Sequence, residues 1–403
     1  MSEWKKVKLG ELYEVHNGLS KGRQFFGSGY PFLSFSTVFN NWFLPKELDS
    51  LVQSSEKERA ACSIKKGDVF ITRTSETMDE LGMSSVALRD YQDATYNGFT
   101  KRLRPITDEV VPEYIGYYLR SKKFRSKFMA FSTMTTRASL ANGDLLSMEV
   151  ELPEKAEQIS IATILSRYDS LIENYQKQIK LLEEAAQRLY KEWFIDLRFP
   201  GHENTKIVDG VPEGWEKKKV NAIVELQSGF AFKSVTFEEK GQYKVVTIKN
   251  VKDGQFDGDN VSFLKTIPEK MPPHCVLQTG DILLSLTGNV GRVCMVIGED
   301  YLLNQRVAKL KTEYPAFVYC LFRNHDMFVA VNNLANGAAQ QNVSPIRIGE
   351  LDLVISDKET MNSFEGITGK IKSQIMHLFS QIRLLTEARD RLLPKLMSGE
   401  IAV

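Results

Sequence analysis

The sequence predicts an α+β protein with two pseudo-symmetric domains of mixed β-sheet, separated by two long helices that form an antiparallel coiled coil. Three observations lead to this fold class. The second half of the chain repeats the first, each half contains short apolar runs between turn residues, and two long segments carry heptad patterns. A chain of 403 residues is long enough for two or three domains, and a hydrophobic fraction of 42% supplies sizeable cores.

The internal repeat defines the domains. QIKLLEEAAQRLYKEW at 178–193 and QIRLLTEARDRLLPKL at 381–396 are identical at half of their positions. Two further pairs are GDVFITRTSE with GDILLSLTGN, and YNGFTKRLRP with LNQRVAKLKT, in the same order along both halves. A duplication of this kind normally produces two similar structural units. The predicted parts are a first globular domain (1–153), a central long helix (154–195), a linker (196–211), a second globular domain (212–355) and a C-terminal long helix (356–403).

The globular domains contain matched strands and helices. PFLSFSTVF, DVFITRT and SMEVELP are predicted strands of the first domain, and YKVVTIKNV, DILLSLT and ELDLVIS are predicted strands of the second. The segments 112–131 and 315–331 each begin with proline and are each predicted to form one helix. Gly, Asn, Ser and Thr clusters between these elements are typical of loops. Each sheet is therefore expected to be twisted, and largely antiparallel or mixed.

The two long helices carry apolar residues at alternating spacings of four and three. This 3.5-residue period is typical of a coiled-coil seam, interrupted in the second helix by the polar residues Thr368 and Arg389. An antiparallel pair would place the two domains at opposite ends of a rod. The predicted seam consists of Ile161, Leu165, Tyr168, Ile172, Tyr175, Ile179, Leu182, Leu189, Ile371, Ile375, Leu378, Ile382, Leu385 and Leu392.

The ends of the second long helix have recognisable signals. Ser356 and Glu359 are predicted to form a capping box at its start. Pro394 is expected to disturb the helix near its end because proline lacks the amide hydrogen, and Gly399 is expected to stop it.

Several function classes find no support in the composition. The net charge is +1, so attraction to nucleic acid must come from local surfaces. The first residues lack the apolar core of a signal peptide, and no run of eighteen apolar residues predicts a membrane span. The four cysteines include no CxxC pair and the five histidines have no metal-ligand spacing. A cytoplasmic protein with free thiols and without a structural metal is expected.

One stretch resembles an enzyme motif. Phe25, Gly27 and Gly29 form F-x-G-x-G, which resembles the cofactor loop of adenine methyltransferases. Such a loop follows a strand and opens a helix, whereas this one precedes an apolar run that is predicted to be a strand. The equivalent place in the second half has one glycine, so a turn is favoured. Since no P-loop, nuclease carboxylate pair or nucleophile elbow is present, no catalytic residue is predicted.

Basic and polar segments occur at matched places in both halves. YYLRSKKFRSKF at 117–128 and KRLR at 101–104 contain no acidic residue, while RTSET, STMTTRAS, NQR and GAAQQN are rich in hydrogen-bonding side chains. A basic run is often only a solvated helix face, but together these segments favour a DNA surface, with cations on phosphates and polar groups on base edges. The candidate DNA-binding residues are Lys21, Arg23, Arg73, Thr74, Ser75, Lys101, Arg102, Arg120, Lys122, Lys123, Arg125, Thr136, Arg137, Lys233, Lys249, Asn250, Thr287, Asn289, Gln305, Arg306, Gln340, Gln341 and Asn342.

Four segments together resemble the specificity subunit of type I restriction-modification systems, over essentially the whole chain. They are LPEKAEQISIATIL, QRLYKEWFIDLRFPG, VPEGWEKKKV and LLPKLMSGEI. The resemblance implies that the globular parts are target recognition domains, each recognising one half of a bipartite, asymmetric target in double-stranded DNA. It implies that the helices set the spacer between the halves and dock modification subunits.

The same resemblance implies that catalysis lies in partners. Two modification subunits would bind S-adenosylmethionine and methylate adenine at N6, and two restriction subunits would use ATP and Mg²⁺ for translocation and cleavage. No cofactor is expected in this chain. The second half departs from the first at its helix start, where DKETMNSFEG replaces EKAEQISIAT, so the docking at the two ends is not expected to be identical. Two alternatives remain open: an assembly scaffold that does not bind DNA, and a fused adenine methyltransferase.

Overall fold

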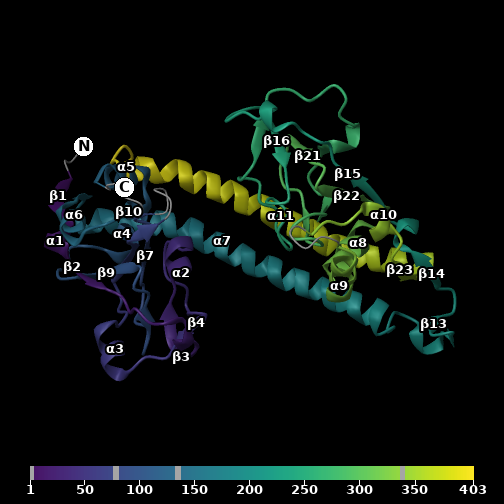
Figure 1. The fold of residues 1–403 in the computed structure, drawn as a ribbon, viewed down its shortest axis with the longest axis horizontal. Helices are drawn as coiled ribbons and strands as arrows, with labels where there is room; N and C mark the ends of the chain where they lie inside the picture. The colour runs from purple at the N-terminus through teal and green to yellow at the C-terminus, as the bar shows by residue number, and fades with distance from the viewer. Residues whose placement is uncertain (1–3, 76–80, 132–137, 336–340) are drawn as a thin grey trace. The chain divides into compact units, whose positions relative to one another are not determined.

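A computed structural model describes residues 4–75, 81–131, 138–335 and 341–403 (Figure 1). The chain divides into two compact units, one of residues 1–171 with 385–403 and one of residues 172–384. Two long helices, α7 (Lys155–Tyr190) and α11 (Lys358–Met397), pass from one unit into the other. Each unit therefore contains one globular domain and the adjoining parts of both long helices.

The first unit is built on a four-stranded antiparallel sheet, β2-β9-β5-β7, and a three-stranded mixed sheet, β4-β3-β8. Two small antiparallel pairs, β1 with β11 and β6 with β10, complete its strands. The strands are β1 (Lys5–Lys8), β2 (Tyr13–Asn17), β3 (Phe26–Leu33), β4 (Ser50–Val52), β5 (Val69–Thr72), β6 (Thr74–Ser75), β7 (Ser84–Val86), β8 (Thr95–Tyr96), β9 (Thr100–Pro105), β10 (Ala138–Ser139) and β11 (Glu149–Leu152). The shorter helices are α1 (Leu9–Leu12), α2 (Phe35–Asn40), α3 (Glu56–Ala61), α4 (Pro112–Arg120), α5 (Lys122–Phe131), α6 (Asn142–Ser147) and the 3₁₀ turn η1 (Arg23–Phe25).

The second unit has the same plan, with sheets β15-β22-β19-β20 and β17-β16-β21-β18 and the separate pairs β12 with β13 and β14 with β23. Its strands are β12 (Ile207–Val208), β13 (Val211–Pro212), β14 (Glu216–Lys219), β15 (Glu225–Ser228), β16 (Tyr243–Val246), β17 (Ser262–Leu264), β18 (Val276–Leu277), β19 (Ile282–Ser285), β20 (Val293–Met295), β21 (Tyr301–Leu303), β22 (Val307–Lys311) and β23 (Asp352–Ile355). Its helices are α8 (Pro315–Arg323), α9 (His325–Asn333), α10 (Pro345–Gly349), the π-helical turn η3 (Lys191–Ile195) and the 3₁₀ turns η4 (His202–Asn204), η5 (Val220–Ala222), η6 (Ser234–Thr236) and η7 (Pro273–Cys275).

The repeat predicted from the sequence is confirmed in the sheet topology. The central strands β5 and β19 are buried along their full length, and each lies between two antiparallel neighbours. Each mixed sheet contains one parallel pair, β3 with β8 and β16 with β21. The predicted fold class, α+β with matched mixed sheets and two long helices, is the one observed.

Each unit packs its globular domain onto the parts of α7 and α11 that it contains. In the first unit, Ile161 and Leu165 of α7 share a core with Leu393 and Leu396 of α11. In the second unit, Ile179 of α7 lies in one core with several α11 residues, among them Ile375 and Leu378. The first unit thus joins the start of α7 to the end of α11, and the second unit joins the end of α7 to the start of α11. The two helices are therefore antiparallel within each unit.

The predicted seam positions are all buried or partly buried. Because they recur on one side of each helix, they leave a polar opposite side in water. Thr368, one of the two polar interruptions, is buried and donates its hydroxyl to the carbonyl of Phe364, so its polar group is satisfied within the helix.

Two helices predicted as single elements are each broken in two. The first is divided at Ser121 into α4 and α5, and the second at Asn324 into α8 and α9. Both residues have extended backbone angles, and their side chains accept hydrogen bonds from the amides of Phe124 and Asp326. Each side chain therefore caps a new helix, a signal that the sequence prediction overlooked.

The predicted strand PFLSFSTVF is wrong in its second half. Strand β3 ends at Leu33, and Ser34 caps α2 by accepting a hydrogen bond from the Thr37 amide at 3.1 Å. The F-x-G-x-G stretch lies within and just before β3, where the pairing with β4 shifts between Phe26 and Tyr30. Gly27 and Gly29 have φ angles of +98° and +103°, so they form an irregularity in a strand rather than a turn into a helix.

The ends of α11 differ in part from the prediction. Asp357 caps the helix, accepting from the amide and hydroxyl of Thr360 at 2.9 Å each, so the predicted capping box of Ser356 and Glu359 is wrong. The helix continues through Pro394 to Met397. Gly399 follows with a φ of +71°, which confirms its predicted role as the stop.

Candidate nucleic-acid interface

In each unit a glycine brings two loops into backbone contact. A Cβ atom on Gly18 would lie 2.2 Å from the Asn97 carbonyl oxygen, and one on Gly229 would lie 2.3 Å from the Asn304 carbonyl oxygen. The next residues, Leu19 and Phe230, form parallel bridges to the same two asparagines. Only glycine permits so close an approach, so these positions fix where the loops meet.

The asparagines organise matched turns. The Asn97 side chain accepts from the Phe99 amide at 2.7 Å, and its carbonyl accepts from the Thr100 amide at 3.0 Å. Asn304 does the same for the amides of Arg306 and Val307, at 3.2 and 3.0 Å. The two turns therefore have the same two hydrogen bonds to an asparagine but present different side chains.

Two more segments join each turn. The Phe99 carbonyl accepts from the Arg73 amide at 3.0 Å, and the Arg73 carbonyl accepts from the Leu140 amide at 3.1 Å. In the second unit, Arg306, Leu286 and Val343 form the equivalent chain at 3.0 and 2.9 Å. We call the assembled segments the first loop cluster (17–19, 73–75, 97–101 and 138–142) and the second loop cluster (228–230, 286–289, 304–307 and 341–343).

The second loop cluster presents polar side chains to solvent. Thr287 pairs with Asn342 in an antiparallel bridge, and its hydroxyl donates to the Asn342 side-chain oxygen at 2.9 Å. The side chains of Gln305 and Arg306 are exposed and make no hydrogen bond or ion pair with another described residue. Predicted residues that the structure brings together here are Thr287, Asn289, Gln305, Arg306, Gln341 and Asn342.

The first loop cluster has a cationic base and an exposed aromatic ring. The Lys101 ammonium donates to the Asn142 side chain, and an Arg73 Nη1 lies 3.4 Å from the Asn17 side-chain oxygen. Burial, together with the nearby Arg73 charge, lowers the pKa of Lys101, and the buried Nε of Arg73 has no partner within the described part of the chain. Within the described residues these two cations have no acidic partner, and they would gain from an anion such as phosphate. Phe99 stands beside them with 56% of its surface exposed.

Two arginines predicted to bind DNA are held inside the fold. Arg102 is 3% exposed, donates to the Ser63 carbonyl at 2.7 Å and lies over the Tyr96 ring. Arg120 donates to the carbonyls of Ser84, Val38, Phe39 and Asn41, which belong to two earlier segments of the chain. Burial, and secondarily Arg125, lowers the pKa of Arg120 to about 10. Both arginines therefore have a structural role in this fold, because Nη1 of Arg102 and the guanidinium of Arg120 bind protein carbonyls.

Other predicted residues are also engaged within their own unit. Lys21 bonds the Gln53 carbonyl and the Glu58 carboxylate, Lys123 pairs with Glu151, and Arg125 donates to the Leu81 carbonyl. Asn250 is fully buried, and its amide connects Thr247 to the carbonyls of Asp257 and Asn260. Sequence alone could not separate these residues from surface ones, since burial depends on distant segments.

The remaining predicted residues are exposed on other elements or lie outside the described part. Arg23 opens η1, Lys122 opens α5, Lys233 precedes η6 and Lys249 lies in the turn after β16, all exposed. For Thr74 and Ser75 the backbone pairing in β6 is described. Thr136, Arg137 and Gln340 lie outside the described residues.

Sequence reasoning missed the residues that assemble the loop clusters. Gly18 and Gly229, Asn97 and Asn304, and the exposed Phe99 were not predicted. A signal was present, because the repeat aligns NGFT with NQRV and places asparagine against asparagine. Asparagine at the start of a turn commonly forms a hydrogen bond from its side chain to the backbone two residues later.

The first unit attaches its domain to the long helices through a partly buried ion pair. An Arg389 Nη1 lies 2.6 Å from an Asp169 carboxylate oxygen, and the hydroxyl of Tyr117 in α4 donates to the same carboxylate at 2.5 Å. The Arg389 guanidinium also lies over the Trp42 ring. Arg389, an interruption of the seam in the sequence, thus joins α11, α7 and the globular domain.

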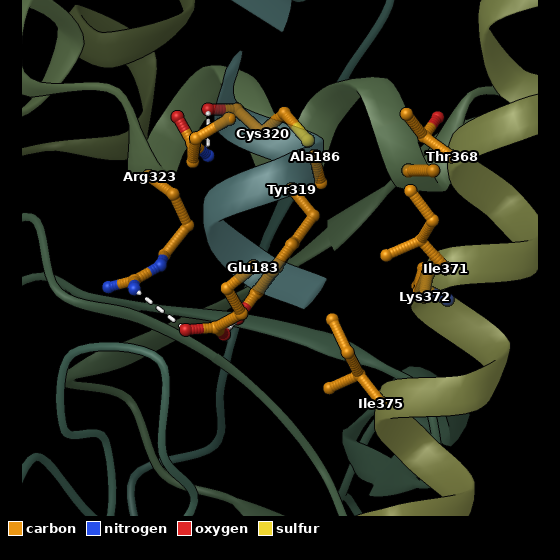
Figure 2. A pocket seen from close by; sticks show the side chains of 11 residues that line it. Glu183, Ala186, Tyr319, Cys320, Arg323, Thr368, Ile371, Lys372 and Ile375 are labelled. Carbon is orange, nitrogen blue, oxygen red and sulfur yellow. Dashed lines mark hydrogen bonds and ion pairs between the residues drawn. The ribbon is translucent and has the colours of Figure 1, made fainter. Parts of the chain in front are cut away.

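The second unit uses different residues for the same purpose (Figure 2). Glu183 of α7 accepts from the Tyr319 hydroxyl at 2.7 Å and pairs with Arg323 at 3.2 Å. The Glu365 carboxylate of α11 accepts from the amides of Ala316 and Phe317, at the first turn of α8. The cavity that Glu183, Tyr319 and Arg323 line with their neighbours has a volume of about 10 Å³. That volume suits about one water molecule, so it is a packing gap and not a ligand site.

No other chemistry is organised in the described residues. They contain no group of three or more His, Cys, Asp or Glu that could hold a metal ion. The cysteines Cys62, Cys275, Cys294 and Cys320 are buried and free, and burial raises the pKa of each thiol, which leaves them unreactive. None of the helices in the described parts combines the length and apolar character that a membrane span requires.

Comparison with known proteins gives a consistent result. The family model described as type I restriction modification DNA specificity domain matches residues 1–184 and 212–389. The MjaIX type I restriction enzyme specificity subunit of Methanocaldococcus jannaschii is 24% identical over 420 residues, with 100% of this chain and 94% of that protein covered. The HindI specificity subunit of Haemophilus influenzae is 23% identical over 473 residues, covering 100% of both.

A solved structure has the same fold. The S subunit of a type I restriction-modification system from M. genitalium matches with a TM-score of 0.57 and 15% identity, over 98% of this chain and 96% of that one.

Proposed function

The chain belongs to the family of type I restriction modification DNA specificity domains, and from that premise we propose how it recognises DNA and assembles. Each unit's globular domain recognises one half of a bipartite, asymmetric target in double-stranded DNA through its loop cluster. The chain acts in the cytoplasm as the specificity subunit of a type I restriction-modification complex and carries out no catalysis itself.

One observation carries the proposal: the two loop clusters have one backbone design and different exposed side chains. Each is assembled by a glycine contact, an asparagine turn and two further backbone hydrogen bonds. One presents Phe99 over a cationic base, and the other presents Gln305 and Arg306. Polar and apolar side chains on a rigid frame are what direct recognition of base edges requires. Unlike side chains on like frames would recognise two unlike half-sites.

Electrostatic attraction in this proposal is local. Because the net charge is only +1, the chain has no overall field to draw it to DNA. Arg73 and Lys101 lie at the base of the first loop cluster, and Arg23 and Lys122 are exposed elsewhere in that unit. Contacts of such cations with phosphates position a protein on the duplex and make affinity fall with salt.

The long helices would set the spacer and dock two modification subunits. The outer side of α7 supports the docking role, because Leu181 is 64% exposed there. Leu181 lies in an open groove of about 410 Å³ that also includes Glu184, Ala185 and Arg188. A groove lined by apolar side chains, here Leu181, Ala185 and Leu189, and rimmed by charged ones is typical of a protein contact.

Methylation and cleavage would reside in the partners. In the proposed complex, two modification subunits bind S-adenosylmethionine and methylate adenine, and two restriction subunits use ATP and Mg²⁺. The alternative of a methyltransferase fused into this chain finds little support, since Gly27 and Gly29 lie in an irregular strand instead of a loop that opens a helix.

The test uses the chain in complex with its cognate modification subunit. We expect the complex to methylate adenines in a split, asymmetric motif, mapped by sequencing of the modified DNA. A contiguous motif, or methylation without sequence preference, contradicts the proposal. Detectable S-adenosylmethionine binding by the chain alone would instead support the fused methyltransferase.

DNA binding distinguishes the proposed function from the alternative of a scaffold that contacts only proteins. Under our proposal the complex shifts duplex DNA at low salt, and its affinity falls steeply as salt rises. No shift at low salt, with the modification subunit present, would favour the scaffold.

A further inference from the structure

We propose that Phe99 and Arg306 are the base-selecting residues of the two matched turns, with Phe99 selecting a thymine through its methyl group and Arg306 selecting a guanine. The inference rests on the proposed function and makes it specific: it names one residue in each domain and the base that each requires.

The turns hold both residues at equivalent points of a rigid frame. The amide of each residue donates to the asparagine two positions earlier, at 2.7 Å for Phe99 and 3.2 Å for Arg306. The carbonyl of each accepts from the neighbouring segment at 3.0 Å, from Arg73 in one unit and from Leu286 in the other. Because the amide and the carbonyl of each residue are both hydrogen-bonded, the backbone that carries the side chain is held in place before DNA binds.

Phe99 is a large apolar side chain exposed in polar surroundings. It is 56% exposed, and Arg73 and Lys101 lie in the same cluster. Exposure of an aromatic ring in water is unfavourable unless a partner covers it. The two cations favour the DNA backbone, and an apolar side chain held next to a duplex has one apolar feature to contact in the major groove, the thymine methyl group.

Arg306 has the opposite chemistry on the same frame. Its guanidinium is exposed and makes no hydrogen bond or ion pair with another described residue. Gln305 precedes it, and Gln341 and Asn342 are exposed in the same cluster, so the surroundings are polar, and no carboxylate of the described residues pairs with the arginine. Arginine presents two parallel donors that match the O6 and N7 acceptors of guanine.

The experiment maps methylation by the full complex carrying Phe99→Ala, Phe99→Leu, Arg306→Ala or Arg306→Lys. We expect Phe99→Ala to relax a thymine requirement at one position in one half of the target, and Phe99→Leu, which keeps an apolar contact, to relax it less. We expect Arg306→Lys to relax a guanine requirement at one position in the other half, because lysine keeps the charge and loses the paired donors. Discrimination at the guanine position should fall by about 5- to 150-fold, the value of a paired-donor contact. At the thymine position it should fall by about 4-fold, the value of one buried methyl group.

Ile106→Ala is the matched control. Ile106 is an apolar residue of the first unit that is 55% exposed and lies outside the loop cluster, so its replacement should leave the motif unchanged. Thermal melting of each variant complex distinguishes loss of folding from loss of selection, and Phe99→Leu provides the test if Phe99→Ala melts early.

The outcomes separate this inference from the proposed function. If the wild-type complex methylates a split motif and the variants methylate the same motif, the inference fails and the function stands. If the variants weaken methylation of all sequences equally, the residues contact the backbone and the inference also fails. If the wild-type motif is contiguous, the proposed function itself fails.

Discussion

Arg120 and Arg323 occupy matched positions at the ends of α4 and α8, yet they bind different groups. Arg120 donates to four backbone carbonyls from α2, its following loop and β7. Arg323 pairs with the carboxylates of Glu183 and Asp253. The same residue type in the same place of a repeat thus serves loop closure in one unit and attachment to a long helix in the other.

Replacement of Arg120 should destabilise the first unit, because Arg120 acts on the fold and not on DNA. Arg120→Met keeps the stem but removes the donors, so buried carbonyls of Ser84, Val38 and Phe39 lose their partners. We expect a loss of about 3 kcal/mol or more in the free energy of unfolding, measured in urea. Lys122→Met, at an exposed position two residues later, is the control and should change stability by less than about 0.5 kcal/mol. Equal effects of the two variants would contradict the structural role.

Glu58 gives a prediction about pH. Its hydrogen bond with Lys21, followed by that from the Ser55 amide, lowers its pKa from 4.5 to about 2. Because the folded-state pKa is lowered, the ionised carboxylate stabilises the fold above pH 4.5, and this contribution disappears as the pH falls towards 2. Glu58→Gln should therefore be less stable than the wild type near neutral pH, and the difference should shrink between pH 4.5 and 2. Urea midpoints across this range measure it; a difference that stays constant would exclude ionisation as the cause.

At the scale of elements, the close contact at Gly229 can be tested directly. A Cβ at this position would lie within 2.6 Å of three backbone atoms, including the carbonyls of Asn304 and Leu303. Gly229→Ala should therefore cost about 1–3 kcal/mol and displace the turn that carries Arg306, so DNA affinity should fall as well. Chemical denaturation and DNA titration measure the two effects.

Gly366→Ala is the control for that variant. Gly366 lies exposed within α11, and a Cβ there would meet nothing within 4 Å. Alanine is favoured over glycine in a helix, so we expect a gain of up to about 1 kcal/mol and no change in DNA affinity. Comparable losses in both variants would mean that the contact at Gly229 is not what fixes the turn.

The elements that could be predicted from the sequence are those whose pattern extends over many neighbouring residues. The strands β5 and β19 and the long helices were predicted because their apolar patterns are local and strong. The helix breaks at Ser121 and Asn324 were missed because both lie inside segments that otherwise favour helix throughout, and a single capping side chain decides them.

The candidate site was predicted less well than the fold. Arg102 and Arg306 lie in the two aligned segments YNGFTKRLRP and LNQRVAKLKT. Arg102 is buried because residues 61–63 cover it, and this contact cannot be recognised in the sequence. Gly18 matters through the carbonyl of Asn97, a residue far along the chain. Such contacts between distant segments leave no periodic pattern in the sequence, so composition alone identified the loops but not the roles within them.

At the scale of the whole molecule, the duplication separates recognition from spacing. Each loop cluster is complete within its own unit, and each unit has its own attachment to the long helices, Arg389 with Asp169 in one and Glu183 with Tyr319 and Arg323 in the other. Replacing one domain should therefore leave the other loop cluster unaffected. The proposed spacer, by contrast, depends on both helices together.

Lengthening both helices should lengthen the spacer between the half-sites. The unit boundary lies after Leu171 in α7 and after Leu384 in α11, so insertions there leave the contacts within each unit intact. Seven residues in each helix preserve the 3.5-residue seam and add about 10 Å, which corresponds to about three base pairs. We expect the methylated motif to keep both half-sites and to gain about three base pairs between them. An insertion of the same length in the exposed turn at Asp209 and Gly210 should leave the spacer unchanged. If both insertions gave the wild-type spacer, the helices would not set the distance, and the separation of the half-sites would have to come from the partner subunits.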